Sequence, residues 1–272
     1  MACPKNEYLD PDKIKVNTKR IGRKILVYNH TSSTNDIAAE YAKNKENDGL
    51  AIFAEEQTAG RGRAGTKWHS GHSDSILCSI LLTSCNCNPE LLSLACPVAV
   101  AEAVGKIAHS QAKIKWPNDI ILNGKKVAGI IVESKTVNGS TAYIVGIGIN
   151  CHQKKSSFPR ELQTTATSID IESRSICDRI SLAKRLLSSL DHWLEVAENT
   201  SPSRLGLAET GKKIIDRWRK LNTLLNQRIT VIYNGRKFTG NCIGVDPEKG
   251  LILQLDRGGV RMFDAVHTTI AK

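Results

Sequence analysis

The sequence IILNGKKVAGIIVE, at residues 120–133, predicts two β-strands joined by a tight turn. Its Asn123-Gly124 pair lies between runs rich in β-branched residues, which is the strongest short-range signal for a β-hairpin. A second hairpin is expected to turn near Asn138-Gly139 and to return along residues 142–150. The centre of the 272-residue chain therefore predicts a largely antiparallel sheet.

Working outward, the apolar patterns predict further strands and several helices. Strands are expected at residues 24–28, 51–54, 76–83 and 112–116, and helices at 89–109, 181–196 and about 205–221, with the helices on one face of the sheet. Residues 151–180 are polar and predict an irregular surface connection. From residue 228 short strands alternate with glycine turns, which is typical of a small SH3-like β-barrel.

These elements predict an α+β fold with a mixed, largely antiparallel sheet, followed by the small barrel. The domain boundaries expected are an N-terminal arm at residues 1–25, a central domain at 26–225 and the barrel at 226–272. The chain length is typical of one large domain or two unequal ones.

A second informative sequence is GRGRAGTKW, at residues 60–68, directly after the strand expected at 51–54. Glycine lets backbone N–H groups approach a ligand closely, and arginine fits carboxylate or phosphate oxygens. This composition favours an anion-binding loop over a merely solvated basic loop. The match to G-x-G-x-x-G does not indicate a dinucleotide fold, because no helix-forming run follows the glycines.

Polar residues also precede a short helical pattern. Ser33 and Asp36 have the spacing of a helix capping box, and Ile37, Ala38 and Tyr41 continue with helical periodicity. The hydroxyl and amide groups of residues 32–35 could serve only to cap the helix, or could also face a polar ligand at its N-terminus. From these residues alone, both interpretations remain open.

Composition narrows the class of protein. The chain is 40% hydrophobic and 24% charged, and no apolar run is long enough to span a bilayer. Its eight cysteines are mostly scattered, which indicates buried thiols rather than a disulfide framework. His69 and His72 lie close together but lack an evident third and fourth zinc ligand. The net charge of +11 is compatible with an anionic ligand, an acidic partner or nucleic acid.

Five sequence blocks, taken together and in order, resemble those of the biotin protein ligases. They are Ser33-Thr34-Asn35, Gln57-Thr58-Ala59-Gly60-Arg61-Gly62-Arg63, Lys115-Trp116-Pro117-Asn118-Asp119, Lys126-Val127-Ala128-Gly129-Ile130 and Gly146-Ile147-Gly148-Ile149-Asn150. One glycine-rich block alone would be weak evidence for a family, whereas five blocks in the same order are strong evidence. The resemblance covers roughly residues 25–270.

The resemblance implies a two-step reaction. The biotin carboxylate attacks the α-phosphate of ATP to give biotinyl-5′-AMP, and a lysine of a biotin carboxyl carrier domain then attacks this mixed anhydride. ATP with Mg²⁺ would be the cofactors and biotin a substrate. Bringing two anions together requires fixed positive charge, which Arg61, Arg63, Lys115 and Lys126 could supply. No nucleophilic side chain is required.

The resemblance also assigns expected roles to individual residues. Lys126 and Arg63 are expected to be catalytic. Biotin contacts are expected from Ser33, Thr34, Asn35, Gln57, Arg61, Gly62, Arg63 and Lys126. ATP or adenylate contacts are expected from Gly60, Arg63, Gly65, Trp68, Lys115, Asn118, Asp119, Gly148 and Asn150, with Asp119 as a possible magnesium ligand and no other metal site assigned.

Two departures from the family pattern bear on these expectations. Ala64 and Thr66 occupy positions at which bacterial relatives often carry arginine, which leaves open how tightly the loop holds phosphates. The sequence before residue 25 is too short for a winged helix, so a monofunctional ligase without specific DNA binding is expected. A cytoplasmic location, no membrane association and a monomer or homodimer are also expected. The competing hypotheses are a lipoate or octanoate ligase and a basic nucleic-acid-binding module.

Overall fold

The computed structural model describes residues 8–85, 88–137, 139–199 and 211–271. Its larger sheet has seven strands in the order β1-β2-β3-β7-β6-β5-β4. Only the β1–β2 pair of this sheet is parallel in the described chain; the remaining pairs are antiparallel. The strands are β1 (Ile25–Thr31), β2 (Ala51–Gln57), β3 (Ser75–Leu82), β4 (Lys113–Lys115), β5 (Asp119–Leu122), β6 (Lys125–Val137) and β7 (Ser140–Asn150).

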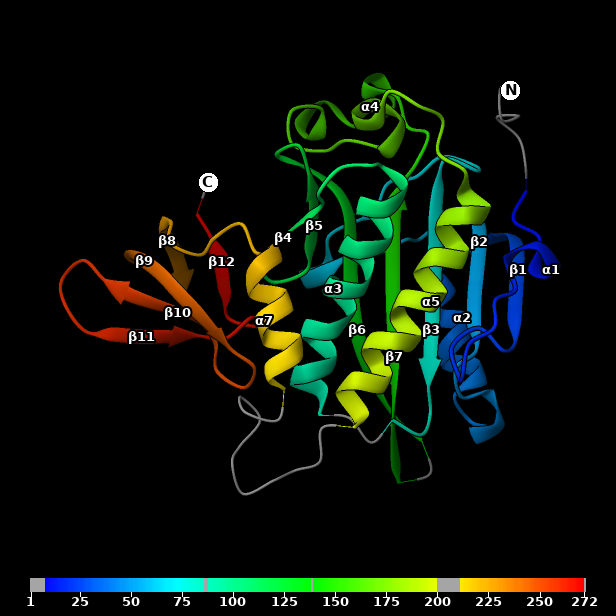
Figure 1. Cartoon of the computed structure of the whole chain (residues 1–272), viewed down its shortest axis with the longest axis horizontal. Coiled ribbons are helices and arrows are strands. Elements are labelled where there is room, and N and C mark those ends of the chain that lie inside the picture. Colours follow the sequence, from blue (N-terminus) through cyan, green and yellow to red (C-terminus); the bar gives the residue numbers. More distant parts are fainter. Residues whose placement is uncertain (1–7, 86–87, 138, 200–210, 272) are drawn as a thin grey trace.

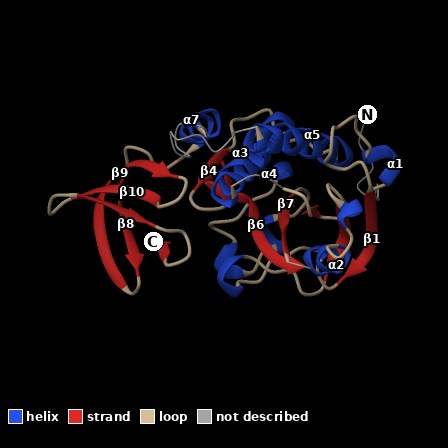
Figure 2. Cartoon of the chain, turned by 90° about the horizontal axis from the view of Figure 1, so that it is seen from below, coloured by secondary structure: helices blue, strands red, loops and turns tan. Residues whose placement is uncertain are grey.

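The helices among the described residues differ in length and in the face they cover. They are α1 (Pro11–Ile14), α2 (Thr34–Tyr41), α3 (Pro89–Ile107), α4 (Ile169–Ser173), α5 (Arg179–Glu198) and α7 (Lys212–Leu221). Figure 2 shows α3, α5 and α7 over one face of the larger sheet and α2 against the other. α3 is apolar over most of its surface and buries 12 residues, whereas α5 and α7 each bury one apolar face.

The expectation of helices on one face therefore holds for α3, α5 and α7, whereas α2 covers the other face. Ala38 of α2 and its C-cap residue Ala42 pack against Ile52, Leu81 and Ile144, and together they form a separate buried cluster. Because side chains alternate across a strand, these residues point away from neighbours such as Phe53 and Ile80, which join the main core. Both faces of β2 and β3 are buried, which explains their continuous apolar runs.

The hairpin predicted at residues 120–133 is confirmed. β5 and β6 pair in antiparallel fashion, and Asn123 and Gly124 both have positive φ angles of 48° and 84°. That combination is the one a two-residue type I′ turn requires. In the second hairpin, β6 and β7 pair from Ala128↔Ile149 to Val137↔Ser140; Asn138, expected in the turn, lies outside the described residues.

The segment predicted to be irregular, residues 151–180, contains α4 and two 3₁₀ turns, Lys155–Ser157 and Arg160–Leu162. The helix expected from about residue 205 begins at Lys212 in the described part, and residues 200–210 lie outside it. No helix of the described ranges combines the length and apolar character needed to cross a membrane.

The C-terminal segment forms a second sheet of five strands in the order β11-β10-β9-β8-β12. The strands are β8 (Arg228–Tyr233), β9 (Arg236–Asp246), β10 (Gly250–Leu255), β11 (Val260–Phe263) and β12 (Thr268–Ile270). The expected α+β class is confirmed, but the ladder is open, because β11 and β12 do not pair with each other in the described chain. We propose a domain boundary near residue 226, since this sheet begins at Arg228 (Figure 1).

Candidate active site

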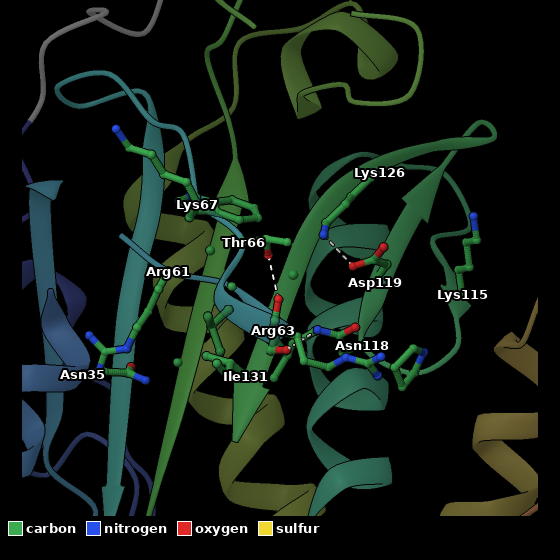
Figure 3. Close-up of a pocket in the computed structure, with 18 of the residues that line it drawn as sticks. Asn35, Arg61, Arg63, Thr66, Lys67, Lys115, Asn118, Asp119, Lys126 and Ile131 are labelled. Carbon is green, nitrogen blue, oxygen red and sulfur yellow. Dashed lines mark hydrogen bonds and ion pairs between the residues drawn. The ribbon is translucent and has the colours of Figure 1, made fainter. Parts of the chain in front are cut away.

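A cavity of about 370 Å³ lies between the larger sheet, the glycine-rich loop and β12. This volume is within the range of small-molecule sites. It brings together residues from all five sequence blocks, and Figure 3 shows Asn35 and Arg61 on one side and Lys126, Asp119 and Asn118 on the other. Of the predicted site residues, the lining includes Ser33, Thr34, Asn35, Gln57, Arg61, Gly62, Arg63, Trp68, Lys115, Asn118, Asp119, Lys126 and Gly148.

One end of the cavity is a network of neutral polar groups. The backbone N–H and the hydroxyl of Thr34 both donate to Gln57 Oε1, at 2.7 and 3.0 Å. Ser79 Oγ lies 2.7 Å from Thr34 Oγ1 and 2.5 Å from Asn35 Oδ1. Ser33, Thr34, Asn35 and Ser79 are all buried. Buried polar groups with several partners are held in fixed orientations, so this polar end is preorganised.

The cap of α2 differs from the capping box that was expected. Ser33 is the N-cap, but its hydroxyl accepts from the backbone N–H of Asn35 at 3.3 Å. The Asp36 carboxylate instead pairs with Arg61 Nη1 at 2.7 Å. A charged partner satisfies the carboxylate more strongly than the neutral backbone N–H of the cap residue does.

Arg61 lies at the rim, where carboxylates surround it. Its Nε and Nη2 donate to Glu133 at 3.1 and 3.3 Å, in addition to its pair with Asp36. Glu133 also accepts from Asn35 Nδ2 at 2.8 Å. The hydrogen bonds to Glu133 are the largest cause of the raised pKa of the Arg61 guanidinium. Arg61 thus links the loop to the polar end of the cavity.

Arg63 is held differently and carries the less compensated charge. Its Nη2 donates to the backbone oxygen of Thr268 at 3.1 Å, while Nη1 is buried with no hydrogen-bond partner among the described residues. Burial lowers the pKa of the Arg63 guanidinium, and Asp119 partly offsets this effect. A buried donor without a partner costs free energy, so this nitrogen favours an anionic ligand in the cavity.

Lys126 projects into the same end from β6. Its Nζ lies 2.5 Å from Asp119 Oδ1 and 5.8 Å from the centre of the Trp68 ring. The backbone of Lys126 is fixed on the other side, where its N–H donates to Thr165 O and its carbonyl accepts from Thr167 N–H, each at 2.8 Å. Strand β6 therefore fixes the backbone of Lys126, and the side chain extends from it into the cavity.

Glycines of β6 and β7 make room for these side chains. A Cβ at Gly148 would lie 2.4 Å from Trp68 Cε2, and one at Gly146 would lie 2.4 Å from Asn35 Oδ1. Both distances are shorter than real Cβ contacts allow. Gly129 is tight as well, with a Cβ 3.1 Å from Trp68 Cζ3. The glycine pattern is a packing requirement of the cavity wall.

The segment from Lys115 to Asp119 forms a turn at the edge of the sheet. Asn118 Nδ2 donates to Ile130 O at 2.7 Å, and Ile130 N–H donates to Asn118 O at 3.0 Å. These two bonds fix the turn against β6. The Trp116–Pro117 peptide bond is cis. Lys115 is exposed at the rim, and Trp116 is buried in the core with part of its ring in the cavity wall.

Three predicted contacts do not line the cavity. Asn150 is buried and donates to Thr167 O at 2.9 Å, so its amide supports the segment beside Lys126. Gly60 accepts from Trp68 N–H at 3.0 Å, and Gly65 has a φ angle of +73°, so both shape the loop rather than its inner surface. The lining also includes residues to which the sequence assigned no ligand contact, among them Thr66, Lys67, Leu77, Ile131, Gly146, Thr268, Thr269 and Ile270.

Comparison with known proteins gives a consistent result. The sequence profile of the "Biotin/lipoate A/B protein ligase family" matches residues 27–150. The "Bifunctional ligase/repressor BirA" of Bacillus subtilis is 32% identical over 252 residues, covering 91% of this chain and 74% of that protein. The "Biotin--[acetyl-CoA-carboxylase] ligase" of Mycobacterium tuberculosis is 29% identical over 257 residues, which cover 90% of this chain and 89% of that protein.

A solved structure agrees at the level of fold. The biotin protein ligase from Aquifex aeolicus in complex with biotin and ATP superposes with a TM-score of 0.76 at 24% identity, covering 92% of this chain and 99% of that one. At this identity the likeness shows that the two proteins share a fold.

Proposed function

This chain belongs to the biotin protein ligases of the biotin/lipoate A/B protein ligase family, and we propose that it catalyses ATP-dependent ligation of biotin to a lysine of a biotin carboxyl carrier domain. The observation that carries the proposal is the division of one cavity into a neutral polar end and a cationic end. Biotin has a neutral ureido group and a carboxylate at opposite ends, which matches this division.

The polar end is suited to the ureido group. Ser33, Thr34, Asn35 and Gln57 offer hydroxyl and amide groups that both donate and accept hydrogen bonds. Ile131 and Ile147 add apolar wall beside them. A neutral ring system that needs several hydrogen bonds and an apolar contact is therefore a better ligand for this end than an anion.

The cationic end is suited to the first chemical step. A biotin carboxylate oxygen attacks the α-phosphorus of ATP, the bond to the bridging oxygen of the diphosphate breaks, and biotinyl-5′-AMP and diphosphate result. Arg63 and Lys126 lie where two anions have to approach each other, and their charge stabilises the additional negative charge of the transition state. In this role the Lys126 ammonium exchanges Asp119 for ligand oxygens.

The second step needs access more than further charge. The lysine amine of the acceptor attacks the acyl carbon, the bond to the AMP oxygen breaks, and the amide and AMP form while the amine loses a proton. Enclosure of the adenylate by the loop would protect the anhydride from water until the acceptor arrives. Trp68, stacked against Gly148, would form one wall at the nucleotide.

Mg²⁺ is proposed as the companion of ATP. Asp119 is a half-buried carboxylate in the lining, and a single carboxylate plus phosphate oxygens is a normal ligand set for this ion. The ion would supply charge compensation on the departing diphosphate. A cytoplasmic location, a monomer or homodimer, and the absence of specific DNA and membrane binding are further proposals.

The proposal is tested by supplying purified protein with biotin and ATP labelled at the α-phosphate. Biotinyl-5′-AMP should appear with diphosphate, and a biotin carboxyl carrier domain added afterwards should gain the mass of biotin. Lipoate in place of biotin serves as the control. A transfer that occurs only with lipoate, or no adenylate with either acid, contradicts the proposed function.

A further inference from the structure

A cluster of two histidines and a glutamate lies outside the cavity. His30, Glu56 and His72 each present one ligand atom, and these atoms all lie within 4.8 Å of one another. His30 of β1 and Glu56 of β2 are direct neighbours in the parallel ladder, with Nδ1 and Oε2 3.1 Å apart. His72 comes from the segment that joins the glycine-rich loop to β3. The sequence showed no further metal ligands near His72, and the fold brings His30 and Glu56 to it.

The hydrogen bonds around His72 fix which nitrogen is free. Ser73 Oγ donates to Glu55 Oε2 at 2.8 Å and lies 3.0 Å from His72 Nδ1. Glu55 is fully buried and also accepts from Arg179 Nη2 and from the backbone N–H of Leu9, each at 2.6 Å, so donors surround its side chain. The single hydroxyl proton of Ser73 is therefore used, and His72 Nδ1–H must donate to Ser73. In a neutral imidazole of this tautomer, Nε2 is the nitrogen that has the free lone pair.

This arrangement is the usual support of a metal-binding histidine, whose second ring nitrogen donates to a fixed acceptor. The acceptor is held in place here, because the Ser73 N–H donates to the Glu55 carbonyl at 3.0 Å and its hydroxyl donates to the Glu55 carboxylate. The ring of His72 is held further by an edge contact with Tyr8, with the ring centres 5.8 Å apart. Both histidines are exposed; His72 has its hydrogen bond to Ser73 and its contact with Tyr8, and the His30 ring can rotate toward it.

We infer that His30, Glu56 and His72 form a binding site for a divalent first-row transition metal ion, with Zn²⁺ as the expected occupant. Two imidazoles and a carboxylate are a common three-residue set for zinc, with water as the fourth ligand. Metal–ligand distances of about 2.0–2.2 Å place tetrahedral ligands roughly 3.4 Å apart, so the ligand atoms, which lie within 4.8 Å of one another, would have to approach by at most about 1.4 Å. Two nitrogen ligands disfavour Mg²⁺, which prefers oxygen.

The site would tie the base of the glycine-rich loop to the edge of the sheet. Glu56 directly precedes Gln57 of the polar end, and His72 follows the loop by a few residues. A bound ion would add a direct link among β1, β2 and the segment before β3, which are already joined by the β1–β2 ladder and by the bonds of Ser73 to Glu55. Because it binds the folded arrangement and not the unfolded chain, it would raise the melting temperature of the whole protein.

The test uses the full-length protein after treatment with a chelator. Co²⁺ is added as a spectroscopic probe, and Zn²⁺ is then added as a competitor. One Co²⁺ per chain should bind and be displaced by Zn²⁺. His72→Ala and His30→Ala should each weaken binding more than about tenfold, since each removes a ligand, and Glu56→Gln should weaken it as well. Zn²⁺ should raise the melting temperature of the unaltered protein but not of His72→Ala.

The matched control is His69→Ala, which removes an exposed histidine of the same segment that is not in the cluster. This variant should bind Co²⁺ like the unaltered protein. Equal losses for His69→Ala and His72→Ala, or no binding at millimolar Co²⁺, would overturn the site. A thiolate-to-cobalt charge-transfer band would place the ion on cysteine and would also overturn it. The outcome is independent of ligase activity, so failure here leaves the proposed function untouched.

Discussion

At one end of the cavity Thr34 and Gln57 bond to each other, whereas at the other end Arg63 Nη1 and Trp68 Nε1 are buried without a hydrogen-bond partner in the described chain. The polar end is built on helix α2 and strands β2 and β3, which pack on both faces. The cationic end combines a loop, a strand lysine and the edge of the second sheet. The side chains of the polar end already bond to one another, whereas the cationic end has buried donors that lack an acceptor.

The difference suggests how binding and chemistry are divided. A preorganised network loses little entropy when it receives a neutral ligand, because its side chains are fixed beforehand. Cations that lack some hydrogen-bond partners interact most favourably with an arriving anion. This interaction strengthens further as negative charge grows in the transition state. Substitutions at the two ends should therefore separate affinity for biotin from the rate and retention of the adenylate.

The largest effect is expected from Lys126→Ala. It removes the ammonium group proposed to stabilise the reacting anions but keeps the backbone bonds to Thr165 and Thr167. Adenylate formation should slow by about 10²–10³-fold, the scale of losing one key transition-state contact. Single-turnover release of diphosphate measures the rate. Lys125→Ala, one residue away and outside the lining, is the control; an unchanged rate for Lys126→Ala would remove this residue from the mechanism.

The next largest effect is expected from Arg63→Ala. Loss of hydrogen bonds from a charged group costs about 1.5–3 kcal/mol, so dissociation of biotinyl-5′-AMP should accelerate by roughly 10- to 150-fold. Release of labelled adenylate after rapid dilution gives this rate. Arg61→Ala should have a smaller effect, because Glu133 and Asp36 already hold that guanidinium at the rim. Equal retention by Arg63→Ala and the unaltered protein contradicts the assigned role.

Paired glycine substitutions test whether the two ends are separable. Gly146→Ala forces its Cβ against Asn35, and Gly148→Ala forces its Cβ against Trp68. Overpacking costs about 1–3 kcal/mol, so each should raise one KM by roughly 5- to 150-fold. The KM for biotin should rise in Gly146→Ala and the KM for ATP in Gly148→Ala. Melting temperatures control for loss of folding, and parallel changes in both constants would mean that the ends act as one unit.

The smallest effect is expected from Thr268→Val at the edge of the second sheet. Thr268 Oγ1 is buried, lines the cavity and has no hydrogen-bond partner within the described ranges. Loss of one neutral hydrogen bond to the nucleotide costs about 0.5–1.5 kcal/mol, or a two- to tenfold weaker affinity for ATP. Thr230→Val, whose hydroxyl bonds to Thr239 instead, is the control. Identical ATP affinity in both variants would show that β12 only supports Arg63.

The residues of the cavity were predicted better than their partners. Thirteen of the expected site residues line the cavity. Their sequence blocks lie on or beside strands of the larger sheet, and pairing of these strands brings the blocks together. Asn150 is the instructive exception: its block is at the right place in β7, but its side chain points to Thr167 and away from the lining. A motif fixes the position of a residue in a strand, whereas neighbouring segments decide what its side chain meets.

Contacts over long sequence separations could not be anticipated. Arg63 meets Thr268 across 205 positions, and Arg61 meets Glu133 across 72. No local pattern signals such pairs, because charges at many other positions are equally able to pair. The sequence did not predict that α2 covers the second face of the sheet. The apolar side of this short helix has the same residue pattern whichever face of the sheet it covers.

By itself the sequence determined the local features: the type I′ turn at Asn123-Gly124, the strands around it, and a loop rich in glycine and arginine. These follow from steric limits and side-chain periodicity within a few residues. The tertiary structure alone decided that Arg61 is compensated while Arg63 is not, that β12 closes the cavity, and that His72 meets His30 and Glu56. Charge pairing and desolvation depend on distances in space, which the folded sheet sets and the order of residues does not.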